Sequence, residues 1–244
     1  MNERTPFYII TTIFLFITIV LSLVTTFHLN QNGADFFPNP GTYNGKPIHD
    51  NGFIDKLCWY FSQLTHHTLF FLFGYFSMAL MNRKSVKFFK MVGPLALTIS
   101  VLYFYFLYPR QKLKIHQLSF YNFFSHFMII FLVFCEFMYI DKYEFNETTN
   151  CFIFLITSIL SIYINYCLRG VWSYDLVKLD SLSGWRLVCE TALIMYMFSL
   201  MFYLLKYKNQ PYYGMGNINM MNSAYPLYGL INIIYVLLII NYDK

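Results

Sequence analysis

The sequence predicts an all-α fold, a polytopic transmembrane bundle of about six to seven helices, from three observations. Of 244 residues, 57% are hydrophobic and 12% are charged, which is about half the charged share of an ordinary soluble domain. Aromatic residues make up 22% of the chain, and such residues suit lipid-facing surfaces and interfacial belts. The apolar residues gather into runs near the length that crosses the hydrocarbon core of a bilayer.

Six apolar runs have the length of membrane spans, and a shorter one is a candidate seventh. Hydropathy predicts the six at about 7–29, 57–80, 88–108, 119–140, 150–168 and 187–206, with the seventh at 224–240. The segment from 30 to 56 is rich in Pro, Gly, Asn and Asp, so it is predicted to be a surface loop over one mouth of the bundle. No internal repeat or composition shift divides the chain, and we expect one domain over residues 1–244.

The net charge of +5 comes from residues that lie almost entirely between the apolar runs. This distribution is not that of a nucleic-acid-binding face. The five cysteines show no CxxC spacing, and we interpret them as small buried apolar residues. We therefore expect no metal and no cofactor.

The expected partners are membrane lipids, with a membrane-protein partner or a homo-oligomer as further options. Heavy use of Phe, Ile, Asn, Tyr and Lys is typical of an AT-rich genome. We therefore expect a multi-pass protein of a bacterial plasma membrane, or of an endomembrane if the chain is eukaryotic.

Polar side chains inside the spans are the first candidates for function, because burying them in hydrocarbon is costly without a partner. At about 100° per residue, a continuous helix brings Ser62, Thr65 and Thr68 onto one face, and Asn122 and His126 share a face in the fourth run. The second and fourth runs start on the same side of the membrane. Thr65 and His126 are therefore expected at one depth, roughly 10 to 12 Å below that surface.

Two charged residues belong to the same mouth of the bundle and are supporting candidates. Arg169 lies at the exit of the fifth run and Glu190 lies just inside the sixth. Glu136 does not belong to this group, because ten residues of helix place it about 15 Å from His126 along the axis. We expect Glu136 to have a structural role, paired with Lys142.

Each polar candidate also has a plain structural explanation. A threonine in a membrane helix usually hydrogen-bonds a carbonyl one turn back, which is the commoner role for a residue placed as Thr65 is. His66 and His67 fit helix packing better than metal binding, because no ligand-spacing motif includes them. A single buried histidine such as His126 needs a stronger reason to be there.

Three short segments resemble one known family. They are Phe61–Thr65, the set Asn122, His126 and Glu136 with spacings of four and ten, and the turn Arg169–Tyr174. Over residues 57 to about 206 the chain resembles the superfamily of the androgen-induced and androgen-dependent TFPI-regulating membrane proteins and its bacterial relatives.

The chain departs from this family pattern at two positions. Asp175 stands where a Pro commonly follows the Tyr of the turn, and Phe123 stands where the family has a second His.

The resemblance implies a hydrolase of lipid esters, since animal members are known as Thr-dependent hydrolases of fatty acid esters of hydroxy fatty acids. Carried over by position, Thr65 would be the nucleophile and His126 the general base. Asn122 or Ser62 would orient the histidine or support the oxyanion. This scheme is coherent, because a Thr hydroxyl is inert until a neighbouring base takes its proton.

The alternative is a non-catalytic membrane protein, namely a lipid-binding module, an assembly subunit or a small transporter. The scarcity of buried charge and the long first loop favour it. Within this alternative, binding or assembly is favoured over proton-coupled transport, which would need more acids inside the spans.

Overall fold

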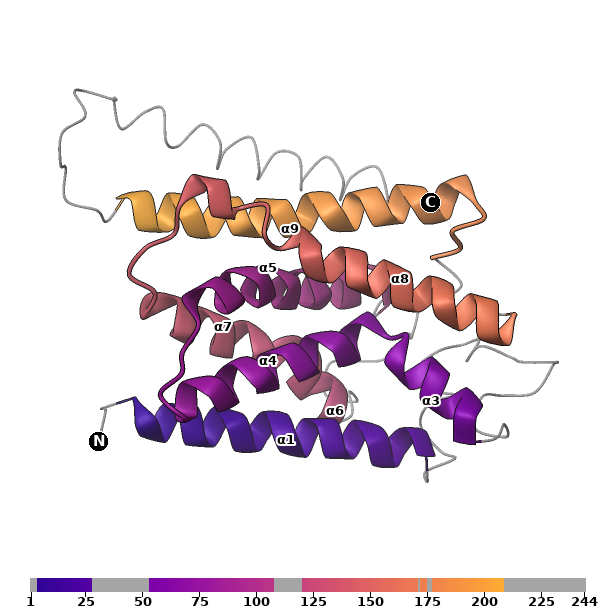
Figure 1. The fold of residues 1–244 in the computed structure, drawn as a ribbon, viewed down its shortest axis with the longest axis horizontal. Helices are drawn as coiled ribbons and strands as arrows, with labels where there is room; N and C mark the ends of the chain where they lie inside the picture. Colours follow the sequence, from indigo (N-terminus) through magenta and orange to yellow (C-terminus); the bar gives the residue numbers. More distant parts are fainter. Residues whose placement is uncertain (1–3, 28–52, 108–119, 171, 175–176, 209–244) are drawn as a thin grey trace.

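The computed structural model describes residues 4–27, 53–107, 120–170, 172–174 and 177–208, and these form an all-α bundle (Figure 1). No strand occurs in these ranges, which confirms the predicted fold class. The α-helices are α1 (Thr5–Phe27), α3 (Phe53–Phe61), α4 (Leu64–Leu80), α5 (Val86–Leu102), α6 (Phe120–Asn122), α7 (Ile129–Met138), α8 (Phe152–Arg169) and α9 (Leu182–Lys208). The candidate seventh run, 224–240, and most of the first loop lie outside the described residues.

Three shorter helical turns complete the described part of the chain. A π-helical turn, Tyr103–Leu107, follows α5 directly, and a second, Phe123–Met128, joins α6 to α7. A 3₁₀ turn, Phe145–Glu147, precedes α8. A π-turn places one extra residue in a helical turn and is frequently found at functional sites.

Four helices in the described ranges are long and apolar enough to cross a membrane. They cover Thr5–Val24, Val86–Tyr105, Phe145–Arg169 and Leu182–Tyr207. Helix α4 has 17 residues, and the apolar segment Phe123–Met138 is also shorter than the roughly 20 residues a crossing needs. This set of helices is compatible with an integral membrane protein.

The outer face of α1 shows how the bundle suits lipid. Ile10, Ile13 and Phe16 are 54%, 53% and 55% exposed, although all three are large and apolar. The opposite face buries Leu15 and Ile19 in the core that α1 shares with α4. A row of exposed apolar residues this long favours hydrocarbon over water as its surroundings.

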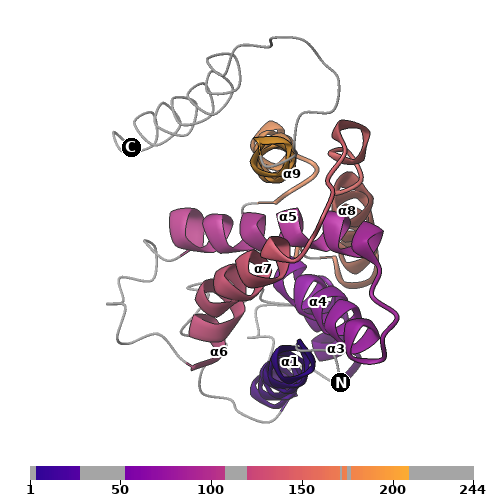
Figure 2. The same cartoon turned by 90° about the vertical axis from the view of Figure 1, so that its left-hand side faces the viewer.

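Helix α5 is the centre of the bundle, with α1 and α9 on opposite sides of it (Figures 1 and 2). It contacts α4, α7, α8 and α9, and all of its residues from Val92 to Ser100 are buried. A helical stretch that is buried on all sides, as this one is, lies at the centre of a bundle. The hydroxyl of Thr98 donates to the Pro94 carbonyl at 2.8 Å, which gives this buried hydroxyl a hydrogen-bond partner inside the helix.

The prediction of one continuous helix over 57–80 is wrong, because the helix is interrupted at Ser62 and Gln63, between α3 and α4. The amide and the hydroxyl of Ser62 both donate to the Trp59 carbonyl, and Gln63 is extended with φ −85° and ψ 121°. The break separates Ser62 from the face that Thr65 and Thr68 were expected to share with it. Thr65 becomes the second residue of α4.

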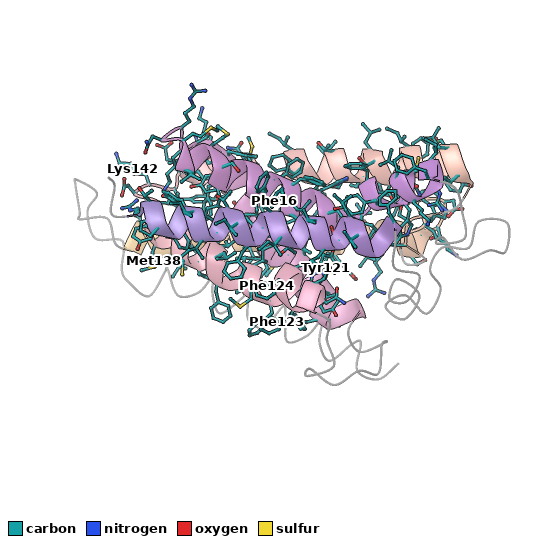
Figure 3. All side chains as sticks on the ribbon, turned by 90° about the horizontal axis from the view of Figure 1, so that it is seen from below. Phe16, Tyr121, Phe123, Phe124, Met138 and Lys142 are labelled. Atoms are coloured by element: carbon teal, nitrogen blue, oxygen red, sulfur yellow. The ribbon has the colours of Figure 1, made fainter. Side chains whose placement is uncertain are left out.

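Glu136 pairs with Lys84 and not, as the sequence predicts, with Lys142. Its Oε1 lies 2.6 Å from Lys84 Nζ and accepts a hydrogen bond from the Tyr75 hydroxyl, and the Glu136 side chain is 0% exposed. Lys142 is exposed beyond the end of α7, at one end of the bundle (Figure 3). The correct partner comes from the turn between α4 and α5, which sequence spacing does not place next to α7.

The prediction that all five cysteines are buried is wrong for most of them. Only Cys151 is buried, and Cys58 is half-buried. Cys135, Cys167 and Cys189 are exposed, on α7, α8 and α9 respectively. A weakly polar thiol is tolerated on an apolar outer face as well as in a core.

Gly170 ends α8 in the left-handed region, with φ 70°, and its amide donates to the Tyr166 carbonyl at 2.7 Å. A Cβ at this position would meet no atom within 4 Å, so the cost of a side chain is that of the backbone alone. We expect Gly170→Ala to lower the free energy of unfolding by about 1–2 kcal/mol. Thermal unfolding in mild detergent measures this. Gly170→Asn, which tolerates this conformation, should lose less, and equal stability of the Ala variant and the wild type would contradict the argument.

Candidate functional site

One cavity lies between the start of α4, the end of α5, α8, the start of α9 and the segment before it. Its empty volume is about 730 Å³ when the open mouth is included. Nine of its fifteen lining residues are aliphatic. The other six are Thr65, Tyr103, His126, Ser158, Tyr174 and Thr191. The structure thus brings Thr65 and His126 to one cavity, as their matched depths predict.

The hydroxyl of Thr65 makes no hydrogen bond with the described part of the chain. The hydroxyl of Thr68, one turn later, is tied to the Leu64 carbonyl at 2.9 Å, which is the ordinary arrangement for a helical threonine. The carbonyl one turn before Thr65 belongs to Phe61, and His67 Nε2 already donates to it at 2.5 Å. The Thr65 hydroxyl is therefore not committed to the backbone.

His126 lies in the π-helical turn before α7 and is 4% exposed. Its ring stacks on the ring of Tyr103, with centroids 3.8 Å apart and planes inclined by 3°. Tyr103 begins the other π-helical turn, so the two irregular turns meet at this ring pair. Neither nitrogen of His126 hydrogen-bonds to a described residue, and Nδ1 is fully buried. A buried imidazole without a partner is costly and calls for an explanation.

His66 and His67 differ from His126 because their nitrogens are engaged in packing. His66 Nδ1 donates to the Tyr60 carbonyl at 2.7 Å, and its ring stacks on Tyr60. His67 donates to Phe61 through Nε2, which leaves Nδ1 to accept from the Ser158 hydroxyl at 3.0 Å. These two residues join α4 to its neighbours, as the packing interpretation predicts.

The Tyr174 hydroxyl covers the N-terminus of α4. The Leu64 amide donates to it at 3.0 Å, and the Thr65 amide is close enough to lower the pKa of the phenol. The residue before the helix, Gln63, provides no side-chain cap, so Tyr174 takes that role from another segment. Burial raises the pKa of the Tyr174 phenol, and the two amides partly oppose this rise. The phenol is therefore neutral at pH 7.

A buried polar network holds the segment that carries Tyr174. Gln63 Nε2 donates to the Ser173 carbonyl at 3.3 Å, and Asn165 Nδ2 donates to the Ser173 hydroxyl at 2.9 Å. Arg169 Nη1 donates to Asn165 Oδ1 at 3.3 Å. Arg169 does not line the cavity. It is 3% exposed and supports the Tyr174 segment indirectly, through Asn165, which donates to Ser173.

The other three supporting candidates also lie outside the cavity lining. Ser62 is buried in the break between α3 and α4, with its hydroxyl on the Trp59 carbonyl. Asn122 is buried at the end of α6. Glu190 forms an ion pair with Arg186, one turn earlier on α9, at 2.7 Å.

Sequence reasoning missed several residues of this region. Ser158 and Asn165 lie on one buried face of α8 together with the candidate Arg169, and the helical arithmetic applied to the second and fourth runs would have found them. Tyr174 entered only through the family resemblance. Tyr103 had no sequence signal, because it is one of 22 tyrosines in the chain.

Comparisons with family models, curated proteins and solved structures find no match for this chain. Within the described residues, no group of three or more His, Cys, Asp or Glu is placed to hold a metal ion. The site is therefore interpreted from its own geometry, which combines an uncommitted Thr hydroxyl, a His without hydrogen-bond partners and a largely aliphatic cavity that both residues line.

Proposed function

We propose that this protein is an intramembrane hydrolase of fatty-acyl esters, with Thr65 as the nucleophile and His126 as the general base. One observation supports the proposal above all. Both side chains line the same cavity, while neither the Thr65 hydroxyl nor the His126 nitrogens hydrogen-bond to the described part of the chain. These are the groups that nucleophilic catalysis requires to be available.

The cavity wall favours an acyl chain as the bulk of the substrate. Nine aliphatic residues from α4, α5, α8, α9 and the segment before α9 line it. Polar groups are few in this lining and include Thr65 and His126, which agrees with the mostly apolar walls and few polar groups of ligand pockets. A fatty-acyl ester entering from the surrounding lipid would place its alkyl chain against the aliphatic walls and its carbonyl near Thr65.

The proposed reaction proceeds in two balanced halves. The Thr65 oxygen attacks the ester carbonyl carbon while His126 takes the hydroxyl proton, and the leaving alkoxide then receives that proton from His126 and departs as the alcohol. A water molecule, deprotonated by His126, attacks the acyl-Thr65 carbonyl. The acyl–oxygen bond to Thr65 breaks, the Thr65 oxygen regains the proton, and the fatty acid leaves.

The resting arrangement differs from a complete triad in two respects. Thr65 and His126 are not hydrogen-bonded to each other, and no carboxylate of the described residues reaches His126 Nδ1. Stacking on Tyr103 therefore sets the orientation of the imidazole ring. Catalytic hydrogen bonds commonly shorten only when substrate binds, so a bound ester carbonyl between the two side chains would complete the geometry.

Covalent labelling by a long-chain fluorophosphonate tests the proposal on purified protein in lipid nanodiscs. We expect one adduct, mapped to Thr65, and labelling at least about 100-fold slower in Thr65→Val, which keeps the shape but removes the hydroxyl. Thr68→Val is the matched control. Thr68 lies one turn after Thr65 on the same helix, and its hydroxyl already donates to the Leu64 carbonyl. Equal labelling of the wild type and Thr65→Val would remove the assignment.

A second candidate function is a lipid-binding protein without turnover. It is favoured because no carboxylate of the described residues hydrogen-bonds to His126. The cavity would then hold the acyl chain of a lipid, and the polar residues would only orient its headgroup. Retention of a defined lipid through purification, with no hydrolysis of long-chain esters by wild type, is the result that would select this candidate.

A further inference from the structure

We infer that the first two amides of α4, from Leu64 and Thr65, form an oxyanion subsite that binds the carboxylate of a long-chain fatty acid, and that the Tyr174 hydroxyl occupies it in the resting protein. The catalytic meaning of this subsite rests on the proposed function, because the same amides would face the oxyanion of the acyl-transfer step. Binding of the acid itself can be measured without turnover.

The first argument concerns the amides. The opening turn of a helix has amides without intrahelical acceptors, and its positive end attracts anions. At α4 the Leu64 amide donates to the Tyr174 oxygen at 3.0 Å, and the Thr65 amide, which follows it, lies near the same oxygen. An oxygen atom of a ligand in that place would accept the hydrogen bond of the Leu64 amide and would lie near the Thr65 amide.

The second argument is independent of the helix end and concerns the cavity beside it. His126 is 4% exposed, lines the same cavity as Leu64, Thr65 and Tyr174, and has no hydrogen-bond partner among the described residues. In the proposed complex, one carboxylate oxygen takes the place of the Tyr174 hydroxyl and the second oxygen accepts from this imidazole. The aliphatic walls, among them Ile159 on α8, supply the surroundings that an alkyl chain requires.

The third argument concerns competition between the phenol and an anion. A neutral phenol oxygen accepts weaker hydrogen bonds than a carboxylate, because charge-assisted hydrogen bonds are about twice as strong. Tyr174 is joined to the rest of the site through Ser173, whose carbonyl and hydroxyl are held by Gln63 and Asn165. A carboxylate can therefore displace the Tyr174 hydroxyl while Ser173 keeps its two contacts.

The decisive variant is Leu64→Pro, which deletes one of the two amide donors. Leu64 is the first residue of α4, where proline is favoured, and Gln63 before it already has the extended conformation that proline demands. Leu64→Ala is the matched control, because it shortens the side chain and keeps the amide. The experiment measures binding of radiolabelled laurate and of dodecanol to the protein in nanodiscs, with binding to empty nanodiscs subtracted. Laurate carries the carboxylate, and dodecanol has the same chain length without it, so the comparison isolates the contribution of the carboxylate.

We expect Leu64→Pro to bind laurate roughly two- to tenfold more weakly than Leu64→Ala, and both variants to bind dodecanol equally. Tyr174→Phe, which removes the competing oxygen, is expected to bind laurate more tightly than wild type by a similar factor. Equal laurate affinity in the Pro and Ala variants would overturn the subsite. Weaker laurate binding in Tyr174→Phe would overturn the displacement of Tyr174.

Thr65→Val separates this inference from the proposed function, since it keeps both amides. If laurate binding shows the expected pattern while Thr65→Val hydrolyses esters as wild type does, the subsite stands and the nucleophile assignment fails. If Thr65→Val loses hydrolysis while laurate binds Leu64→Pro and Leu64→Ala alike, the nucleophile stands and the subsite fails.

Discussion

Replacing His126 by alanine is expected to lower ester hydrolysis by roughly 10²–10⁴-fold, the usual contribution of a positioned general base. The variant leaves a space against the flat face of Tyr103, on which the imidazole ring stacks at 3.8 Å. Added imidazole or 4-methylimidazole can enter that space and is expected to restore part of the activity. Turnover of a long-chain ester with and without added imidazole measures both effects.

A matched control for this prediction is His67→Ala. Both nitrogens of His67 are engaged, by Phe61 and Ser158, so its loss is expected to weaken the packing of α4 on α8. Any loss of activity in this variant should follow the loss of folded protein and should not respond to imidazole. Wild-type turnover by His126→Ala would refute the role of His126, and a loss without rescue in a folded variant would reduce it to a structural residue.

Replacing Glu136 by alanine is expected to lower the free energy of unfolding by about 3 kcal/mol. Removing one partner of a buried ion pair typically costs about 3–5 kcal/mol, because the remaining charge keeps its desolvation penalty. We place the effect at the lower end because the Lys84 side chain is 22% exposed, while that of Glu136 is 0% exposed. The Tyr75 hydroxyl also loses its acceptor. Thermal unfolding in mild detergent, followed by circular dichroism, measures the change.

Lys142→Ala is the control for the Glu136 variant. Lys142 is the partner that the sequence predicts and is exposed in the structure, so its loss should change stability by less than about 0.5 kcal/mol. A large effect in Lys142→Ala, or none in Glu136→Ala, would contradict the pairing of Glu136 with Lys84.

The positions of the helices were predictable because membrane helices need long apolar runs. The predicted run 150–168 corresponds to α8, Phe152–Arg169, and the predicted run 187–206 lies inside α9, Leu182–Lys208. The break at Ser62 and Gln63 was not predictable in this way. It depends on groups more than 100 residues away, since Tyr174 binds the Leu64 amide and Ser173 accepts from Gln63, both at a sequence separation of 110.

The candidate site was predictable in one respect only. Counting residues from the same membrane surface placed Thr65 and His126 at one depth, and the structure brings both to one cavity. Depth along a helix follows from sequence, whereas the direction of a side chain depends on irregular turns. The two π-helical turns stack His126 on Tyr103, and no residue pattern indicated that contact.

The sequence by itself indicated a membrane environment, located the approximate helices and singled out two candidate side chains, because hydropathy and helical rise are local properties of a chain. The tertiary structure decided the partners: Lys84 for Glu136, Tyr103 for His126 and Tyr174 for the first amide of α4. Such contacts join residues that are distant along the chain, and many tyrosines and lysines satisfy the local requirements equally well. Only the packing of the helices selects among them.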